Sequence, residues 1–235
     1  MKFRTTILGA LALAGAVPHL YASEGPHSFS VSGWLVSDYR FRGVSLTQKD
    51  PTVQLGFDYA HESGFYAGLW GSGVDFGPDY PDADLELDVY LGFGFPITDA
   101  VRADLSVVGD KYHNTGALNY NEFIGKLVFN EMITATLGYS NDIYNSDETG
   151  LYFGLSGSFP LPNEFALNAN VGYSDFDDGV LGPGSANYMD YGIGVSRAFG
   201  PAELALTWIA TNGDGKDLFG SNASSRLVGT LKVSF

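Results

Sequence analysis

Cysteine is absent from the 235-residue chain, which excludes a disulfide framework and any thiolate metal site. Basic residues are also scarce, because 12 lysines and arginines stand against 27 aspartates and glutamates and give a formal net charge of −15. Nucleic-acid binding needs clustered basic side chains that contact phosphates. The composition therefore argues against a nucleic-acid partner.

Long apolar runs are missing as well, since none approaches the roughly 20 residues that a membrane-spanning helix needs. The apolar run Ile7 to Val17 follows the basic residues Lys2 and Arg4 and precedes the small residues Ala22 and Ser23. This order is typical of a secretory signal peptide. We therefore expect a signal peptide at residues 1–22 and a single domain at residues 23–235. If that domain enters a membrane, it must do so as a closed β-barrel, the other structure that satisfies every backbone group in lipid.

Apolar and polar side chains alternate at period two along most of the chain. Between residues 84 and 95, leucine, valine and phenylalanine occupy the odd positions, whereas acidic residues, Tyr90 and glycines occupy the even ones. A helix with 3.6 residues per turn would scatter these acids around its surface, so the pattern predicts strands. Twelve segments show it: residues 28–42, 52–60, 64–74, 84–95, 101–107, 123–129, 133–139, 151–159, 165–173, 189–197, 204–210 and 227–235.

The connections alternate between short turns and long polar loops, as in bacterial outer-membrane barrels. Aromatic residues gather at the strand ends, where barrels carry their interfacial rings. Tyr39 and Phe41 are expected in the outward ring beside the long loops. The long loops are expected at residues 43–51, 76–83, 110–118, 141–150, 175–187 and 212–224.

Together these patterns predict an all-β fold, namely a transmembrane antiparallel up-and-down β-barrel of 12 strands in the outer membrane of a Gram-negative bacterium. Its expected surroundings are outer-membrane lipid and lipopolysaccharide, and the barrel assembly machinery would insert it. The even strand number agrees with single-chain bacterial barrels.

Three stretches carry a resemblance to a known family: residues 32–45 (SGWLVSDYRFRGVS), residues 64–72 (GFYAGLWGS) and the acidic strand at residues 84–90. They resemble the TorF family of porin-like outer-membrane proteins, most closely over residues 32–90. The resemblance implies an outer-membrane, porin-like protein. It supplies no substrate and no site residue.

The barrel lumen should receive the charged side chains, because a midplane Arg or Lys facing lipid costs about 2–4 kcal/mol. The alternation places nine acids and six bases inside. Closure of the first strand against the twelfth would bring Arg40, Arg42 and Arg226 together near the outer half of the lumen, opposite an acidic wall. In a second interpretation these charges only neutralise one another and fill the lumen. The candidate selectivity residues are Arg40, Arg42 and Arg226 on the basic side, Asp84, Glu86 and Asp88 on the acidic side, and the inward acid Asp38.

A barrel of this size should leave a narrow passage, because twelve strands about 4.8 Å apart and tilted by about 40° give a backbone cylinder roughly 24 Å across. We therefore expect a porin-like channel for small polar or charged solutes, without a cofactor or metal. The alternatives are a closed structural or adhesive barrel that binds envelope partners through its loops, and an outer-membrane lipid-modifying enzyme.

The sequence offers few candidates for catalytic residues. His27 precedes the first expected strand and His61 lies in a turn, which leaves His113 in an expected outer loop without a serine in a recognisable nucleophile motif. The stretch 212–217 (NGDGKD) has the composition of a calcium loop but lacks the later bidentate glutamate. We therefore expect no enzyme activity.

The last strand ends on Phe235, which is typical of the signal that the assembly machinery recognises in outer-membrane proteins. We predict that deletion of Phe235 lowers the amount of folded barrel in the outer membrane several-fold. The measurement is the band that shifts on boiling in gel electrophoresis of extracted membranes. Equal folded amounts in the two strains would contradict an assembly role for this residue.

Overall fold

The computed structural model describes residues 25–235, and the expected signal peptide lies outside them. Twelve strands pair in one closed antiparallel barrel, in the order β1-β14-β13-β12-β11-β10-β9-β8-β7-β6-β5-β4. The predicted 12-stranded barrel fold is therefore confirmed. The strands are β1 (His27–Val36), β4 (Thr52–His61), β5 (Phe65–Gly73), β6 (Leu85–Thr98), β7 (Val101–Tyr112), β8 (Thr115–Phe129), β9 (Ile133–Ser140), β10 (Gly150–Pro160), β11 (Phe165–Phe176), β12 (Ala186–Phe199), β13 (Ala202–Thr211) and β14 (Arg226–Ser234).

The barrel closes where β1 pairs with β14. The register places Ser32 opposite Ser234 and Val36 opposite Thr230. Beyond the ladder, the Ser37 amide donates to the Gly229 carbonyl over 2.9 Å and extends the seam at the loop end. Each of the twelve strands therefore has two neighbours, and no strand edge is left unpaired.

The outer surface of the barrel is apolar and the inner surface is polar. On β6, Leu91 is 55% exposed while Glu86, on the opposite face of the strand, is 3% exposed. Exposed leucine, valine and phenylalanine side chains continue around every wall strand. An apolar surface of this extent suits hydrocarbon rather than water, as in membrane-spanning barrels. Within residues 25–235, no helix is long and apolar enough to cross a bilayer.

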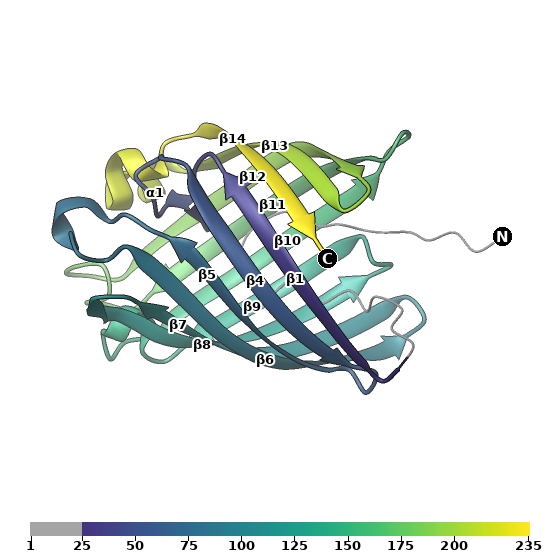
Figure 1. Ribbon diagram of the computed structural model, residues 1–235. Coiled ribbons are helices and arrows are strands. Elements are labelled where there is room, and N and C mark those ends of the chain that lie inside the picture. Colours follow the sequence, from purple (N-terminus) through teal and green to yellow (C-terminus); the bar gives the residue numbers. More distant parts are fainter. Residues whose placement is uncertain (1–24) are drawn as a thin grey trace.

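The connections at the two ends differ in length, as expected. The barrel begins with His27 and ends with Ser234 at the short-turn end. The long connections gather at the other end, with the helix α1 (Gly213–Phe219) among them (Figure 1). The short 3₁₀ helices η1 (Gly77–Asp79), η2 (Ile143–Asn145) and η3 (Gly220–Ala223) also belong to these connections.

The first strand is shorter than predicted. It ends at Val36, and the residues expected to continue it form a small hairpin of β2 (Arg40–Phe41) and β3 (Val44–Ser45). The prediction of Tyr39 and Phe41 in the outward aromatic ring is therefore wrong. Tyr39 is 3% exposed and belongs to a buried cluster with Trp70 and Tyr112, and Phe41 packs against that cluster. Residues 37–42 keep the period-two alternation although the chain turns into the lumen there. The alternation alone therefore does not show where the first wall strand ends.

One long-loop prediction is also wrong. The expected loop at residues 110–118 is a tight hairpin, because β7 and β8 continue until Tyr112 pairs with Thr115, with Asn114 at a positive φ of 59°. Asparagine tolerates this left-handed conformation better than most residues. The calcium-like stretch begins α1, where the Asn212 side chain caps the helix by accepting a hydrogen bond from the Gly215 amide over 3.1 Å.

The outward position of Leu91 in the middle of β6 gives a test of the lipid-facing surface. We predict that Leu91→Arg lowers the free energy of unfolding in lipid vesicles by about 2–4 kcal/mol, because a midplane Arg must be taken from water into hydrocarbon. The measurement is denaturant unfolding followed by tryptophan fluorescence. The matched control is Leu161→Arg, which lies in a short turn and should cost about 0–1 kcal/mol. Equal costs for both variants would contradict this orientation in the membrane.

Candidate functional site

Residues 38–47, called the inward hairpin below, fill the loop end of the lumen. Val44 on one side of the hairpin packs into a buried cluster with Ile143, Phe176 and Tyr188. Tyr39 on the other side packs into a second buried cluster. This second cluster holds Val36, Trp70, Val74 and Tyr112. The hairpin is thus anchored between opposite parts of the barrel mouth.

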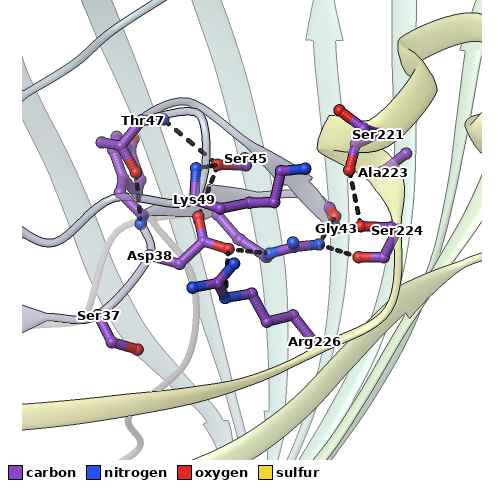
Figure 2. A network of polar contacts seen from close by, with 12 residues as sticks. Ser37, Asp38, Gly43, Ser45, Thr47, Lys49, Ser221, Ala223, Ser224 and Arg226 are labelled. Carbon is purple, nitrogen blue, oxygen red and sulfur yellow. Dashed lines mark hydrogen bonds and ion pairs between the residues drawn. The ribbon is translucent and has the colours of Figure 1, made fainter.

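Asp38 is the centre of the polar network that holds the hairpin (Figure 2). Its carboxylate accepts hydrogen bonds from Arg40 Nε over 2.8 Å and from the Ser45 hydroxyl over 2.6 Å. Arg226 Nε of β14 lies 3.7 Å from the same carboxylate. Arg40 also donates to the Ser224 carbonyl over 2.8 Å and so ties the hairpin to the β13–β14 connection.

Arg42 ties the hairpin to the opposite wall. Its Nη2 donates to Glu122 Oε1 of β8 over 2.5 Å, and its guanidinium stacks on the Tyr152 ring 4.1 Å away. Burial alone would lower the pKa of Arg42, but the Glu122 carboxylate more than offsets this and keeps that pKa above its ordinary value. The Tyr188 hydroxyl donates to the Arg42 carbonyl over 3.0 Å. Arg42 is therefore a charged anchor of the inward hairpin.

Gly43 allows the hairpin to sit this close to the barrel wall. Its φ is +84°, a conformation that costs other residues strain, and a Cβ there would lie 2.8 Å from Thr211 Cγ2 and 2.9 Å from Asp190 Cβ. Glycine tolerates the positive φ and has no Cβ, so it fits this position in both respects. The tip of the hairpin therefore packs directly on β12 and β13.

A cavity of about 440 Å³ lies in the lumen beside the hairpin. Its lining runs from hairpin residues such as Asp38 and Arg40 to Met132 and Ser158 near the short turns. Tyrosine, serine, threonine and charged side chains line it together with apolar residues such as Trp70 and Ile124. The cavity thus extends from the short-turn end up to the hairpin with polar and apolar groups on its wall.

Five of the seven candidate selectivity residues are buried inside the barrel as expected: Glu86 and Asp88 on β6, and Asp38, Arg40 and Arg42 on the hairpin rather than on a wall strand. Asp84 does not. Its side chain is 72% exposed, because β6 begins one residue later and Asp84 stands on the rim. Sequence reasoning in turn missed Asp110, which was assigned to a loop but is buried on β7 and lines the cavity.

The expected basic wall is divided between two ion pairs. Arg40 and the half-exposed Arg226 share Asp38, whereas Arg42 pairs with Glu122. The three arginines therefore do not form one open cluster. Their role in selectivity stays a prediction, as does the role of Phe235 in assembly. Phe235 itself is exposed, and its backbone pairs with that of Val31.

The histidine considered for catalysis lies on the rim. His113 Nδ1 is 2.9 Å from Asp84 Oδ1, and both side chains are more than half exposed. In the described part of the chain no serine hydroxyl hydrogen-bonds to this ring. The arrangement lacks the nucleophile–base pair of a serine hydrolase.

A closed barrel with an apolar outer surface and a charged, cavity-bearing lumen defines the class of porin-like membrane barrels. Within that class the chain belongs to the Gcw_chp family, because the family model described as "Bacterial protein of unknown function (Gcw_chp)" matches residues 21–235. The finer resemblance to the TorF family stays a prediction. No curated protein matches the chain in sequence.

Solved structures of porins share the fold. The NanC porin aligns over 88% of this chain and 99% of that chain, with a TM-score of 0.58 and 8% sequence identity. The KdgM porin aligns with the same coverages, a TM-score of 0.55 and 8% identity. Likeness at such low identity shows the fold. It confirms the predicted barrel fold, which these porins share.

The Asp38 network predicts how the hairpin can be loosened. We predict that Asp38→Asn leaves Arg40 as a buried charge without a counter-ion, a change that costs about 3–5 kcal/mol in comparable pairs. The hairpin should leave its position, and trypsin should then cleave after Arg40 and Arg42 in the folded barrel, with fragments identified by mass spectrometry. Asp50→Asn, an exposed change in the same connection, should stay as resistant as wild type. Equal resistance of all three proteins would show that Asp38 does not hold the hairpin.

Proposed function

We propose that the protein is an outer-membrane channel for passive passage of small polar and charged solutes, with the inward hairpin as the element that closes its outer mouth. The observation that carries this proposal is the cavity inside a closed barrel, which runs from the short-turn end up to the hairpin and has charged and polar side chains in its lining. A lumen filled only for stability would have no need of such a cavity. Lipid, lipopolysaccharide and the assembly machinery remain the expected partners.

The arrangement of lumen charges supports a preference for cations. With Asp110 in place of Asp84, the inward set still holds nine acids and six bases. The arginines of the hairpin are engaged by carboxylates, and Lys126 and Lys232 stand opposite Asp104 and Glu203 in the strand register. Glu86, Asp88 and Asp110 have no basic partner within 4.0 Å among the ion pairs of residues 25–235. Acidic groups in a narrow lumen concentrate cations.

The attachments of the hairpin are compatible with opening. Its ladder consists of two residue pairs, Arg40 with Ser45 and Phe41 with Val44, and it is not part of the barrel sheet. Side chains supply much of its anchoring, including those of Asp38 and Arg42. The hairpin can therefore leave the lumen without breaking the wall.

Planar-bilayer recordings of the purified barrel test the proposal. We predict discrete conductance steps and a reversal potential of cationic sign under a salt gradient, with a preference that weakens toward 1 M salt, where the Debye length is about 3 Å. Absence of any conductance would contradict the channel and favour a closed barrel that binds envelope partners. Clear anion preference would assign control of the constriction to Arg40 and Arg42.

A double variant tests the hairpin, because the chain has no cysteine of its own. Val44→Cys with Ala223→Cys joins two residues of one buried cluster. We expect the oxidised variant to conduct less than the reduced one, whereas Val44→Cys alone should respond to neither treatment. If the oxidised and reduced barrels conduct equally after the disulfide is confirmed by mass spectrometry, the hairpin does not close the channel.

A further inference from the structure

Three carboxylates converge on the lumen beside the inward hairpin. Glu86 and Asp88 lie on β6 and Asp110 on β7, and one oxygen of each lies within 4.8 Å of the others. All three residues are buried, with exposed fractions of 3%, 5% and 7%. The strand register fixes this arrangement, because Asp88 stands directly opposite Asp110. Like charges that face each other across a strand pair are destabilising, so this arrangement calls for a compensating group.

The protein itself supplies little compensation. The ion pairs in the described part of the chain use other carboxylates, namely Asp38, Glu122 and Asp84. Glu86 Oε1 accepts a hydrogen bond from the Tyr112 hydroxyl over 2.8 Å, and the Tyr39 hydroxyl lies near the same carboxylate. Neutral hydroxyl groups do not offset three buried negative charges.

Unpartnered oxygens are the second, independent observation. Asp88 Oδ1 and Glu86 Oε2 are both buried and have no hydrogen-bond partner. No side chain within residues 25–235 donates a hydrogen bond to Asp88 or forms an ion pair with it. Buried polar atoms in folded proteins almost always have a partner, so these oxygens indicate a group that the chain does not provide.

We propose that Glu86, Asp88 and Asp110 bind one divalent cation, and that the donor set fits Ca²⁺. Carboxylate oxygens without nitrogen or sulfur ligands suit hard cations. Calcium–oxygen distances of about 2.3–2.6 Å allow two ligands of one ion to lie up to about 5 Å apart. The three oxygens lie within 4.8 Å of one another, a spread that calcium accommodates. Calcium also tolerates irregular coordination, whereas magnesium demands nearly octahedral geometry.

The cation has a route to this site. Asp88 and Asp110 line the lumen cavity, so an ion and its remaining water ligands reach them from the interior of the barrel. The site does not rest on the proposed channel activity. A barrel that passes no solute but holds this aqueous cavity would bind the ion equally well.

Calorimetric titration of the folded barrel in detergent with CaCl₂, after removal of bound metal with a chelator, tests the site. We expect one Ca²⁺ per chain, and at least tenfold weaker binding in Asp88→Asn and in Asp110→Asn. The matched control is Asp190→Asn, a buried lumen acid of β12 whose carboxylate accepts a hydrogen bond from Asn170. Its dissociation constant for Ca²⁺ should stay within twofold of wild type.

A second measurement uses Tb³⁺ as a luminescent substitute for Ca²⁺. Tyr112 contacts Glu86, and Trp70 stands opposite Asp88, so bound Tb³⁺ should show sensitised emission that excess Ca²⁺ removes. The asparagine variants relieve like-charge repulsion, so they should fold, as checked by the band that shifts on boiling. If one does not fold, Glu86→Gln replaces it in both assays. If the wild type binds Ca²⁺ no more tightly than the folded variants, the proposed site is refuted. Bound protons would then be the compensating charge.

Discussion

Backbone pairing in lipid is the constraint on which the rest of this structure depends. An unpaired N–H or C=O group in hydrocarbon costs several kcal/mol, so the sheet must close on itself. The closing ladder between β1 and β14 runs from Ser32 to Val36, half the length of the ladder between β1 and β4. Hydrogen bonds of Ser37 and Val31 lengthen this seam at its two ends. Closure in turn fixes which face of every strand meets lipid and which meets the lumen.

A closed wall of twelve strands encloses more space than its inward side chains fill, whereas eight strands can be filled by side chains. At the loop end the chain fills this space with its own connection between β1 and β4. The inward hairpin carries apolar residues such as Tyr39 and Val44 into clusters on two sides of the mouth. Its charged residues then need partners inside the barrel, and Asp38 and Glu122 provide them.

The strands could be predicted from the sequence because lipid and lumen impose period two on every wall residue. The same rule placed Glu86 and Asp88 inside correctly. It failed where alternation continues beyond the wall, since residues 37–42 alternate but are held by contacts with residues far along the chain, such as Ser224 and Glu122. The ends of the strands were also predicted inaccurately. Asp84 has the parity of a lumen residue but precedes β6, and Asp110 lies on a strand that continues past its predicted end.

The proposed opening of the hairpin would separate ion pairs as well as apolar contacts, and the two kinds of contact differ in how strongly they hold the hairpin inside the lumen. In the closed position each hairpin arginine has a buried carboxylate partner, which offsets the cost of removing both ions from water. If the hairpin moved out, Arg42 and Glu122 would separate, but water entering the lumen would hydrate both. Because hydration of Arg42 and Glu122 would replace much of the energy of their ion pair, this ion pair favours the hairpin position inside the lumen only modestly. Apolar packing of Val44 and of the Tyr39 ring opposes opening more strongly, because these groups lose their buried contacts and water does not replace them.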